Sequence, residues 1–312
     1  MYNKLTIEDI DVTGKRVFCR VDFNVPIEHG QITDDTRIRA ALPTVKHLLG
    51  QGARLILASH LGRPKGKVDP AFSLKPVAEY LEQLLGSTVK MAPDCLGPKV
   101  TEMADGLAPG DVLLLENVRF HKGETENDPA FAAELAKLAD IYVNDAFGTA
   151  HRAHASTEGV ARLLNPAVAG YLMQKELKYL GSALADPQRP FIAILGGAKV
   201  SDKITVIENL LPKVDSILIG GGMAYTFLRA KGIEIGTSLV EEDRVALAAS
   251  LLRKAEEQGV AFLLPFDHAV ATEFSADSPM QICRNENFPT TMMGLDIGPQ
   301  SIEAYTAKIS EA

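Results

Sequence analysis

Two lysines lie where a helix is expected to begin, directly after a glycine turn. Residues 191–195 form an apolar run with β-branched side chains, which predicts a buried strand ending at Gly196 and Gly197. Lys199 and Lys203 follow at the predicted start of a helix. A cation at a helix N-terminus is locally unfavourable by roughly 0.3–1 kcal/mol. The placement makes chemical sense if a phosphate lies between the two ammonium groups. The alternative is a pair of solvated surface lysines.

Residues able to bind an anion also follow predicted strands in the first half of the chain. Apolar runs at residues 16–23, 54–59, 112–115 and 141–144 predict these strands. The residues at or just after their carboxyl ends are Asp22, Asn24, His60, Arg63, Arg119, His151 and Arg152. In a parallel sheet these ends meet at one edge, where such sheets bind ligands. Several arginines there predict an anion site, because guanidinium matches carboxylate and phosphate oxygens. For each arginine alone, the alternative is a surface salt bridge.

Length, charge and cysteine content limit the class of protein. The chain has 312 residues, which favours two domains, and a net charge of −8, which argues against a general nucleic-acid binder. Its three cysteines are isolated, so neither a disulfide framework nor a zinc site is indicated. There is no signal-peptide pattern and no apolar run near the roughly 18 residues of a membrane span. We therefore expect a cytoplasmic protein.

Strands and helices alternate along the chain, which predicts an α/β fold with parallel sheets. A helical pattern at 170–185 ends at Asp186 and Pro187, and the second half then repeats the scheme. A strand at 216–219 runs into Gly220, Gly221 and Gly222, and a further strand and turn are expected at 292–298. The triple glycine permits close approach of a ligand, but a tight packing turn is the alternative. The chain contains neither a G-x-G-x-x-G fingerprint nor a P-loop, which disfavours a nicotinamide dehydrogenase.

Seven segments, in order along the chain, together resemble the phosphoglycerate kinase family. They are R-V-D-F-N-V-P from Arg20, S-H-L-G-R-P from Ser59, L-L-E-N-V-R-F from Leu114, D-A-F-G-T-A-H-R-A-H from Asp145, G-G-A-K-V-S-D-K from Gly196, G-G-G-M-A from Gly220 and G-L-D-I-G-P from Gly294. The resemblance implies two Rossmann-like three-layer domains with parallel sheets. It places a phosphoglycerate-binding domain at 1–169, a connecting helix and hinge at 170–187, and a nucleotide-binding domain at 188–312.

The resemblance also implies site residues. Those matching the family's binding site for 3-phosphoglycerate or 1,3-bisphosphoglycerate are Asp22, Phe23, Asn24, Arg37, His60, Leu61, Gly62, Arg63, Arg119 and Arg152. Those matching the ATP or ADP site are Gly197, Lys199, Lys203, Gly220, Gly221, Phe274, Gly294 and Leu295. Arg37, Lys199 and Lys203 are the expected catalytic residues, with Mg²⁺ bound to the nucleotide. The expected protein is a glycolytic monomer that binds neither nucleic acid nor membranes.

The implied reaction needs no general base, because the accepting carboxylate is already ionised at neutral pH with a pKa near ~4. Catalysis then rests on alignment and on neutralising the charge of the phosphoryl group. We assign that charge to Arg37 and Lys203, and the 3-phosphate to Arg63, Arg119 and Arg152. Domain closure is expected to align the ligands and exclude water.

One feature departs from the family pattern. The sequence ends at Ala312, whereas family members continue through segments that supply a glutamate to the ribose and an aspartate to the metal–nucleotide. The nucleotide domain is therefore expected to be incomplete, with no metal ligand in this sequence. The alternative function is a catalytically impaired relative that binds phosphoglycerate but holds nucleotide weakly.

Overall fold

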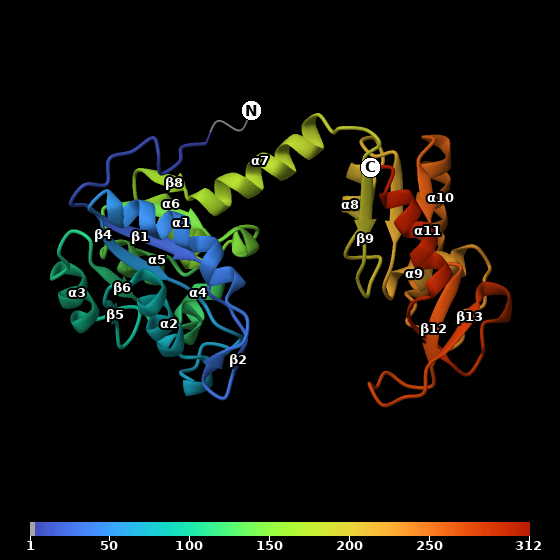
Figure 1. Ribbon diagram of the computed structural model, residues 1–312, viewed down its shortest axis with the longest axis horizontal. Coiled ribbons are helices and arrows are strands. Elements are labelled where there is room, and N and C mark those ends of the chain that lie inside the picture. Colours follow the sequence, from blue (N-terminus) through green and yellow to red (C-terminus); the bar gives the residue numbers. More distant parts are fainter. Residues whose placement is uncertain (1–3) are drawn as a thin grey trace. The chain divides into compact units, whose positions relative to one another are not determined.

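The computed structural model describes residues 4–312. These fall into two compact units, the first ending at Ser182 and the second running from Ala183 to Ala312 (Figure 1). The division falls within helix α7 (Tyr171–Ala185), inside the segment expected to connect two domains. Among the described residues, we find no helix with both the length and the apolar character needed to cross a membrane.

The first unit is built on a six-stranded parallel sheet with the order β5-β6-β4-β1-β7-β8. Its strands are β1 (Arg16–Val21), β4 (Arg54–Ala58), β5 (Val89–Met91), β6 (Val112–Leu114), β7 (Ile141–Asp145) and β8 (Ala167–Ala169). Central β1 pairs with β4 on one side and β7 on the other, so Val17 lies opposite both Leu55 and Ile141. The four strands predicted in this half are present. The three-residue strands β5 and β8 were not predicted.

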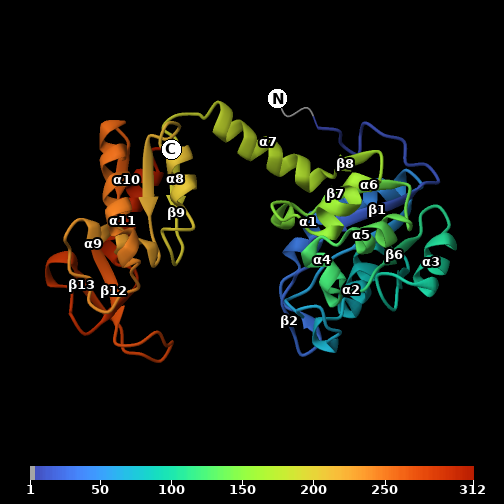
Figure 2. The same ribbon diagram turned by 180° about the vertical axis from the view of Figure 1, so that it is seen from behind.

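Helices cover both faces of this sheet, as the two views show (Figures 1 and 2). Alternate residues of β1 face opposite sides: Cys19 packs in a core with α1 and α2, and Phe18 packs in another with α3 and α5. The helices of the unit are α1 (Thr36–Gly50), α2 (Lys75–Leu85), α3 (Pro98–Asp105), α4 (Lys122–Glu126), α5 (Pro129–Ala136), α6 (Val160–Leu163) and α7, with a hairpin of β2 (Ile27–Glu28) and β3 (Gln31–Ile32). The unit is therefore a three-layer α/β structure.

The second unit contains a parallel sheet and a separate antiparallel sheet. The parallel sheet has the order β11-β10-β9, with β9 (Ile192–Leu195), β10 (Ser216–Ile219) and β11 (Ala261–Leu263). Helices α8 (Ile204–Leu210), α9 (Met223–Ala230) and α10 (Val245–Glu257) share one core with it. At the end of β10, Tyr305 of α11 (Pro299–Ile309) donates a hydrogen bond to the carbonyl of Ile219 at 2.8 Å.

The antiparallel sheet is the main difference from the predicted architecture. It consists of β12 (Asp267–Ala271), β13 (Gln281–Arg284) and β14 (Met293–Ile297), in the order β13-β12-β14. The strand expected at 292–298 is present, but it pairs with β12 rather than joining the parallel sheet. Strands β12 and β13 were not predicted, because they are short and neither contains a continuous apolar run of four residues.

Candidate active site

In the first unit, loops from three strands meet at the carboxyl edge of the sheet. Arg37 in the first turn of α1 forms an ion pair with Asp22, with Nη1 to Oδ2 at 2.7 Å. The Gly62 backbone N–H donates to Asn24 Oδ1 at 2.8 Å. The Gly62 carbonyl accepts from Arg119 Nη1 at 2.9 Å. The structure thus brings together residues that follow β1, β4 and β6, as their strand positions predict.

A cavity of about 530 Å³ lies beside these loops. Its lining includes the three predicted arginines Arg63, Arg119 and Arg152. The remaining lining residues were not predicted from the sequence; they are Lys65, Gly66, Lys122, Thr125, Glu126 and His154. Lys65 and His154 lie only two residues from Arg63 and Arg152, so proximity in sequence was an available signal. His151, also expected near the site, is exposed and lies outside this lining.

Arg119 carries a charge that the described residues do not fully compensate. Arg119 is only 9% exposed, and its buried Nε has no hydrogen-bond partner among the described residues. Burial lowers the pKa of its guanidinium, and the positive charges of Arg152, Arg20 and Arg63 lower it further. Arginine nevertheless remains protonated in proteins. A buried, under-paired cation beside a cavity lined by further cations is suited to an anion.

His60 is buried and neutral. Arg20 is fully buried and was not among the predicted site residues; its Nη2 lies 3.1 Å from His60 Nδ1. Arginine can only donate, so Nδ1 accepts and the neutral ring carries its proton on Nε2. Burial, together with the charges of Arg20 and nearby arginines, lowers the pKa of His60 to about 2. The Arg20 Nε–H in turn donates to Ser156 Oγ, whose hydroxyl donates to buried Glu124.

Three of the predicted site residues can offer a ligand only their backbone. The side chains of Phe23 and Leu61 are buried in the core, so only their main chain can face a ligand. The Phe23 N–H already donates to Ser59 Oγ at 2.8 Å. Gly62 adopts a φ of +60°, and a Cβ there would overlap the ring of Phe72. This turn therefore requires glycine.

In the second unit, two glycine turns pack against each other at the carboxyl ends of β9 and β10. The Met223 N–H donates to the Gly197 carbonyl at 2.8 Å. Gly221 has a φ of +67°, and a Cβ there would lie 2.9 Å from that same carbonyl oxygen. A Cβ added at Gly220 would meet no atom within 4 Å. Within the triple glycine, Gly221 is therefore required for tight packing, whereas Gly220 leaves room for a ligand to approach the backbone.

Lys199 and Lys203 extend from the first of these turns. Lys203 is the N-cap residue of α8, and Lys199 lies in the exposed turn before it. Among residues 4–312, no carboxylate oxygen lies within the 4.0 Å ion-pair limit of either ammonium nitrogen. Between them, Ser201 donates its N–H and its hydroxyl to Glu241, which holds the turn in place. Both lysines are therefore available to an anion.

The residues expected on the adenine side have different surroundings. Gly294 and Leu295 lie in β14, and Gly294 contacts the Tyr225 ring so closely that a Cβ would overlap it. Phe274 lies in the loop after β12, and its side chain is 89% exposed. The structure therefore does not bring Phe274 into a packed pocket, and its ring offers a free apolar surface.

Comparisons with known proteins agree with this arrangement. A family model described as phosphoglycerate kinase matches residues 7–312. A phosphoglycerate kinase from Moorella thermoacetica is 60% identical over 309 residues, covering 99% of this chain and 78% of that protein. One from Koribacter versatilis is 56% identical over 318 residues, covering 99% of this chain and 79% of that protein. This chain belongs to the phosphoglycerate kinase family. Its relatives are phosphotransferases, and the match does not favour the alternative of a catalytically impaired family member.

Solved structures of the family support the fold assignment. The phosphoglycerate kinase from Coxiella burnetii superposes with a TM-score of 0.81 at 42% identity, covering 99% of this chain and 78% of that one. The enzyme from Pyrococcus horikoshii superposes with a TM-score of 0.83 at 31% identity, covering 98% and 78%. The predicted Rossmann-like α/β class is thereby confirmed.

Proposed function

We propose that this protein transfers a phosphoryl group reversibly between 1,3-bisphosphoglycerate and ADP, giving 3-phosphoglycerate and ATP. The observation that carries the proposal is the buried, under-paired Arg119 at a cavity shared with Arg63 and Arg152. Three guanidinium groups provide forked donors suited to the oxygens of the non-reacting 3-phosphate. The cavity of the first unit is accordingly the phosphoglycerate site in this proposal.

The remaining residues of that site orient the reacting end of the substrate. His60 donates from Nε2, since Arg20 occupies Nδ1. Asp22 is fixed by Arg37 and accepts a substrate hydroxyl, while the other donors of the half-exposed Arg37 stay free for the transferring phosphoryl group. No side chain has to remove a proton, because the accepting carboxylate is already ionised at neutral pH. The contribution of these residues is positioning and charge stabilisation.

We assign the nucleotide phosphates to Lys199, Lys203 and the glycine turn formed by Gly197, Gly220 and Gly221. Two ammonium groups without carboxylate partners support this assignment. Mg²⁺ is expected with the nucleotide, but these residues do not fit the metal itself, since an ammonium group has no lone pair to donate and Mg²⁺ binds oxygen. No step of the proposed reaction is therefore assigned to the metal. Transfer requires the ligands of the two units to be brought into line.

The wider cellular description is also a proposal. We place the protein in the cytoplasm as a glycolytic monomer, with residues 1–169 binding phosphoglycerate, 170–187 connecting, and 188–312 binding nucleotide. The net charge of −8 supports a small-molecule role rather than binding to nucleic acid.

Replacing Lys203 with alanine tests the assignment of the nucleotide side. Lys203→Ala should lower kcat by about 10²–10³-fold, because it removes a preorganised charge from the transferring phosphoryl group. Affinity for 3-phosphoglycerate should stay within about twofold, because Lys203 belongs to the other unit. Turnover is measured by coupled assay and affinity by calorimetry. The exposed Lys231→Ala is the matched control and should resemble the unsubstituted protein.

Two outcomes count against the proposal. If Lys203→Ala abolishes 3-phosphoglycerate binding, Lys203 has been assigned to the wrong ligand. If the unsubstituted protein binds 3-phosphoglycerate normally, binds ADP weakly and forms no ATP, the impaired alternative replaces the proposed function.

A further inference from the structure

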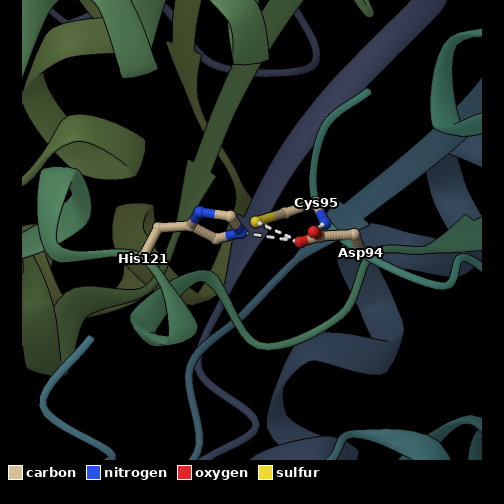
Figure 3. A group of neighbouring side chains, drawn as sticks. All are labelled: Asp94, Cys95 and His121. Carbon is tan, nitrogen blue, oxygen red and sulfur yellow. Dashed lines mark hydrogen bonds and ion pairs between the residues drawn. The ribbon is translucent and has the colours of Figure 1, made fainter. Parts of the chain in front are cut away.

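A second group of chemically active side chains lies in the first unit, outside the lining of the cavity. Asp94 and Cys95 are in the loop between β5 and α3, and His121 lies between the short helix 118–120 and α4. Figure 3 shows their side chains pointing toward one another from these two segments. His121 Nε2 is 2.7 Å from Asp94 Oδ1, and Cys95 Sγ is 3.5 Å from the same oxygen. One nitrogen, one oxygen and one sulfur thus converge within 4.8 Å.

This donor set matches the chemistry of zinc. Zn²⁺ binds thiolate sulfur at about 2.3 Å and imidazole nitrogen or carboxylate oxygen at about 2.0–2.2 Å, usually in a tetrahedron. Such bond lengths place neighbouring ligand atoms roughly 3.3–3.6 Å apart. The sulfur–oxygen separation already fits, whereas the oxygen–nitrogen separation of 2.7 Å has to widen by roughly half an ångström. A rotation of the partly exposed Asp94 or His121 side chain can provide that change.

Burial of Cys95 leaves this group of side chains open to an ion from one side. Cys95 is fully buried, whereas the side chains of Asp94 and His121 are 44% and 29% exposed. An ion would therefore reach the sulfur from the side of Asp94 and His121, which leaves a fourth position open to water. The His121 ring packs against Phe131 with centroids 5.2 Å apart, and the Cys95 N–H donates to Asp94 Oδ1 at 2.6 Å. These contacts keep the three donors close together, so that only a small side-chain rotation is needed to bind an ion.

We propose that Asp94, Cys95 and His121 form a binding site for a borderline-soft divalent cation such as Zn²⁺, with water completing the coordination. The ion is held by Oδ1 of Asp94, Sγ of Cys95 and Nε2 of His121. Binding forms the metal–sulfur bond as the Cys95 S–H bond breaks, and that proton passes to solvent. The metal–nitrogen bond replaces the Nε2–H bond that His121 donates to Asp94, so the neutral ring loses the proton on Nε2 and takes one from solvent on Nδ1. The site joins the loop before α3 to the start of α4, so the bound ion stabilises the folded first unit. The proposal is independent of the kinase reaction, since none of the three residues lines the cavity.

Cobalt provides the direct test, because a thiolate–Co²⁺ bond gives a charge-transfer absorption that oxygen and nitrogen ligands do not. The metal-free protein is titrated with Co²⁺ in the absence of nucleotide, and Zn²⁺ is then added to displace the Co²⁺. The affinity for Zn²⁺ is measured by competition with a chromophoric chelator. We expect one equivalent of Co²⁺ to produce the band, and Zn²⁺ to displace it. Zn²⁺ should also raise the Tm, because an ion that binds only the folded state stabilises that state.

Variants of the ligands and matched controls decide the outcome. Cys95→Ser should abolish the band, and His121→Asn, at a partly exposed position that tolerates substitution, should weaken Zn²⁺ binding by more than roughly tenfold. Cys283→Ser and His29→Asn remove a cysteine and a histidine elsewhere and should leave binding unchanged. Absence of the band in the unsubstituted protein overturns the proposal. So does Zn²⁺ binding that survives in both ligand variants, which would locate the ion at another site.

Discussion

The protonation state of His60 is set by the residues around it. The ring is 3% exposed, it accepts from Arg20, and its Nδ1 is 4.0 Å from Asp22. Arg119, Arg152 and Arg37 add positive charge that disfavours a second proton on the ring. A histidine in an anion site is often taken as a further cation. In the proposed site it is instead a neutral donor, and the arginines provide the charge.

This state predicts a specific loss of stability in acid. The pKa of His60 is about 2 in the folded protein and near ~6.5 when unfolded, so the unfolded state binds the proton first as the pH falls. The His60 contribution is fully present above about pH 7 and is lost progressively below about pH 6.5. Between about pH 7.5 and pH 5.5 the free energy of unfolding should fall by about 1 kcal/mol more than in His60→Gln.

Urea unfolding of both proteins at the two pH values measures this difference. His154 also has a lowered pKa, chiefly through burial, but it is present in both proteins and cancels in the comparison. Equal losses in the two proteins would mean that His60 is not buried in its neutral form.

At the scale of elements, the turn after β4 links the strand to the cavity. Gly62 receives a hydrogen bond at its carbonyl from Arg119 and donates its N–H to Asn24. Its positive φ and its contact with Phe72 both exclude a side chain. The position of Arg119 therefore depends on a backbone conformation that only glycine adopts easily.

Gly62→Ala should destabilise the protein and weaken its substrate site together. We expect the free energy of unfolding to fall by about 2–4 kcal/mol, because alanine is strained at a positive φ and its Cβ displaces Phe72. Affinity for 3-phosphoglycerate should fall by about tenfold or more, because Arg119 loses its carbonyl partner. Gly52→Ala is the matched control: its φ is +74°, but its Cβ would meet no atom within 4 Å. That variant should lower the free energy of unfolding by only about 1 kcal/mol and leave the affinity for 3-phosphoglycerate unchanged.

Urea unfolding and calorimetry provide both quantities for each variant. If Gly62→Ala costs no more than Gly52→Ala, the contact with Phe72 is not tight. If it destabilises the protein without changing affinity, the turn does not position Arg119.

At the scale of the whole molecule, each unit has its own apolar cores. The cores of the first unit lie on the two faces of its six-stranded sheet. Those of the second unit centre on β10 with α9 and α10, and on Val270 of β12 with Tyr225 and Phe288. Because the cores are separate, each unit is expected to respond to its own ligand.

Hydrogen exchange measured by mass spectrometry tests this separation. 3-Phosphoglycerate alone should slow exchange in segments 22–24, 60–66 and 119–126, because the ligand fixes the loops that line the cavity. ADP alone should slow exchange at 196–203 and 220–222. Protection of 196–203 by 3-phosphoglycerate alone would contradict the assignment of the two ligands to separate units.

Much of the fold and part of the site could be predicted because the signals are local. The apolar runs and the helical pattern located β1, β4, β6, β7, β9, β10 and α7, because a buried strand or helix face leaves apolar residues at a characteristic spacing in the sequence. The placement of Lys203 at a helix start and of Arg63, Arg119 and Arg152 near strand ends follows from the same signals. Family-specific motifs then indicated the reaction.

The tertiary structure decided which side chains meet. Short strand β12 forms a sheet by pairing with β13 on one side and β14 on the other, and such pairing leaves little trace in strands that lack a long apolar run. Arg20 and His60 are 40 residues apart, and Cys95 and His121 lie in different loops. No spacing rule predicts these pairs, because the crossover connections of the sheet bring their loops together. Residue types determined the chemistry available to this protein, whereas packing determined which of those residues share a site.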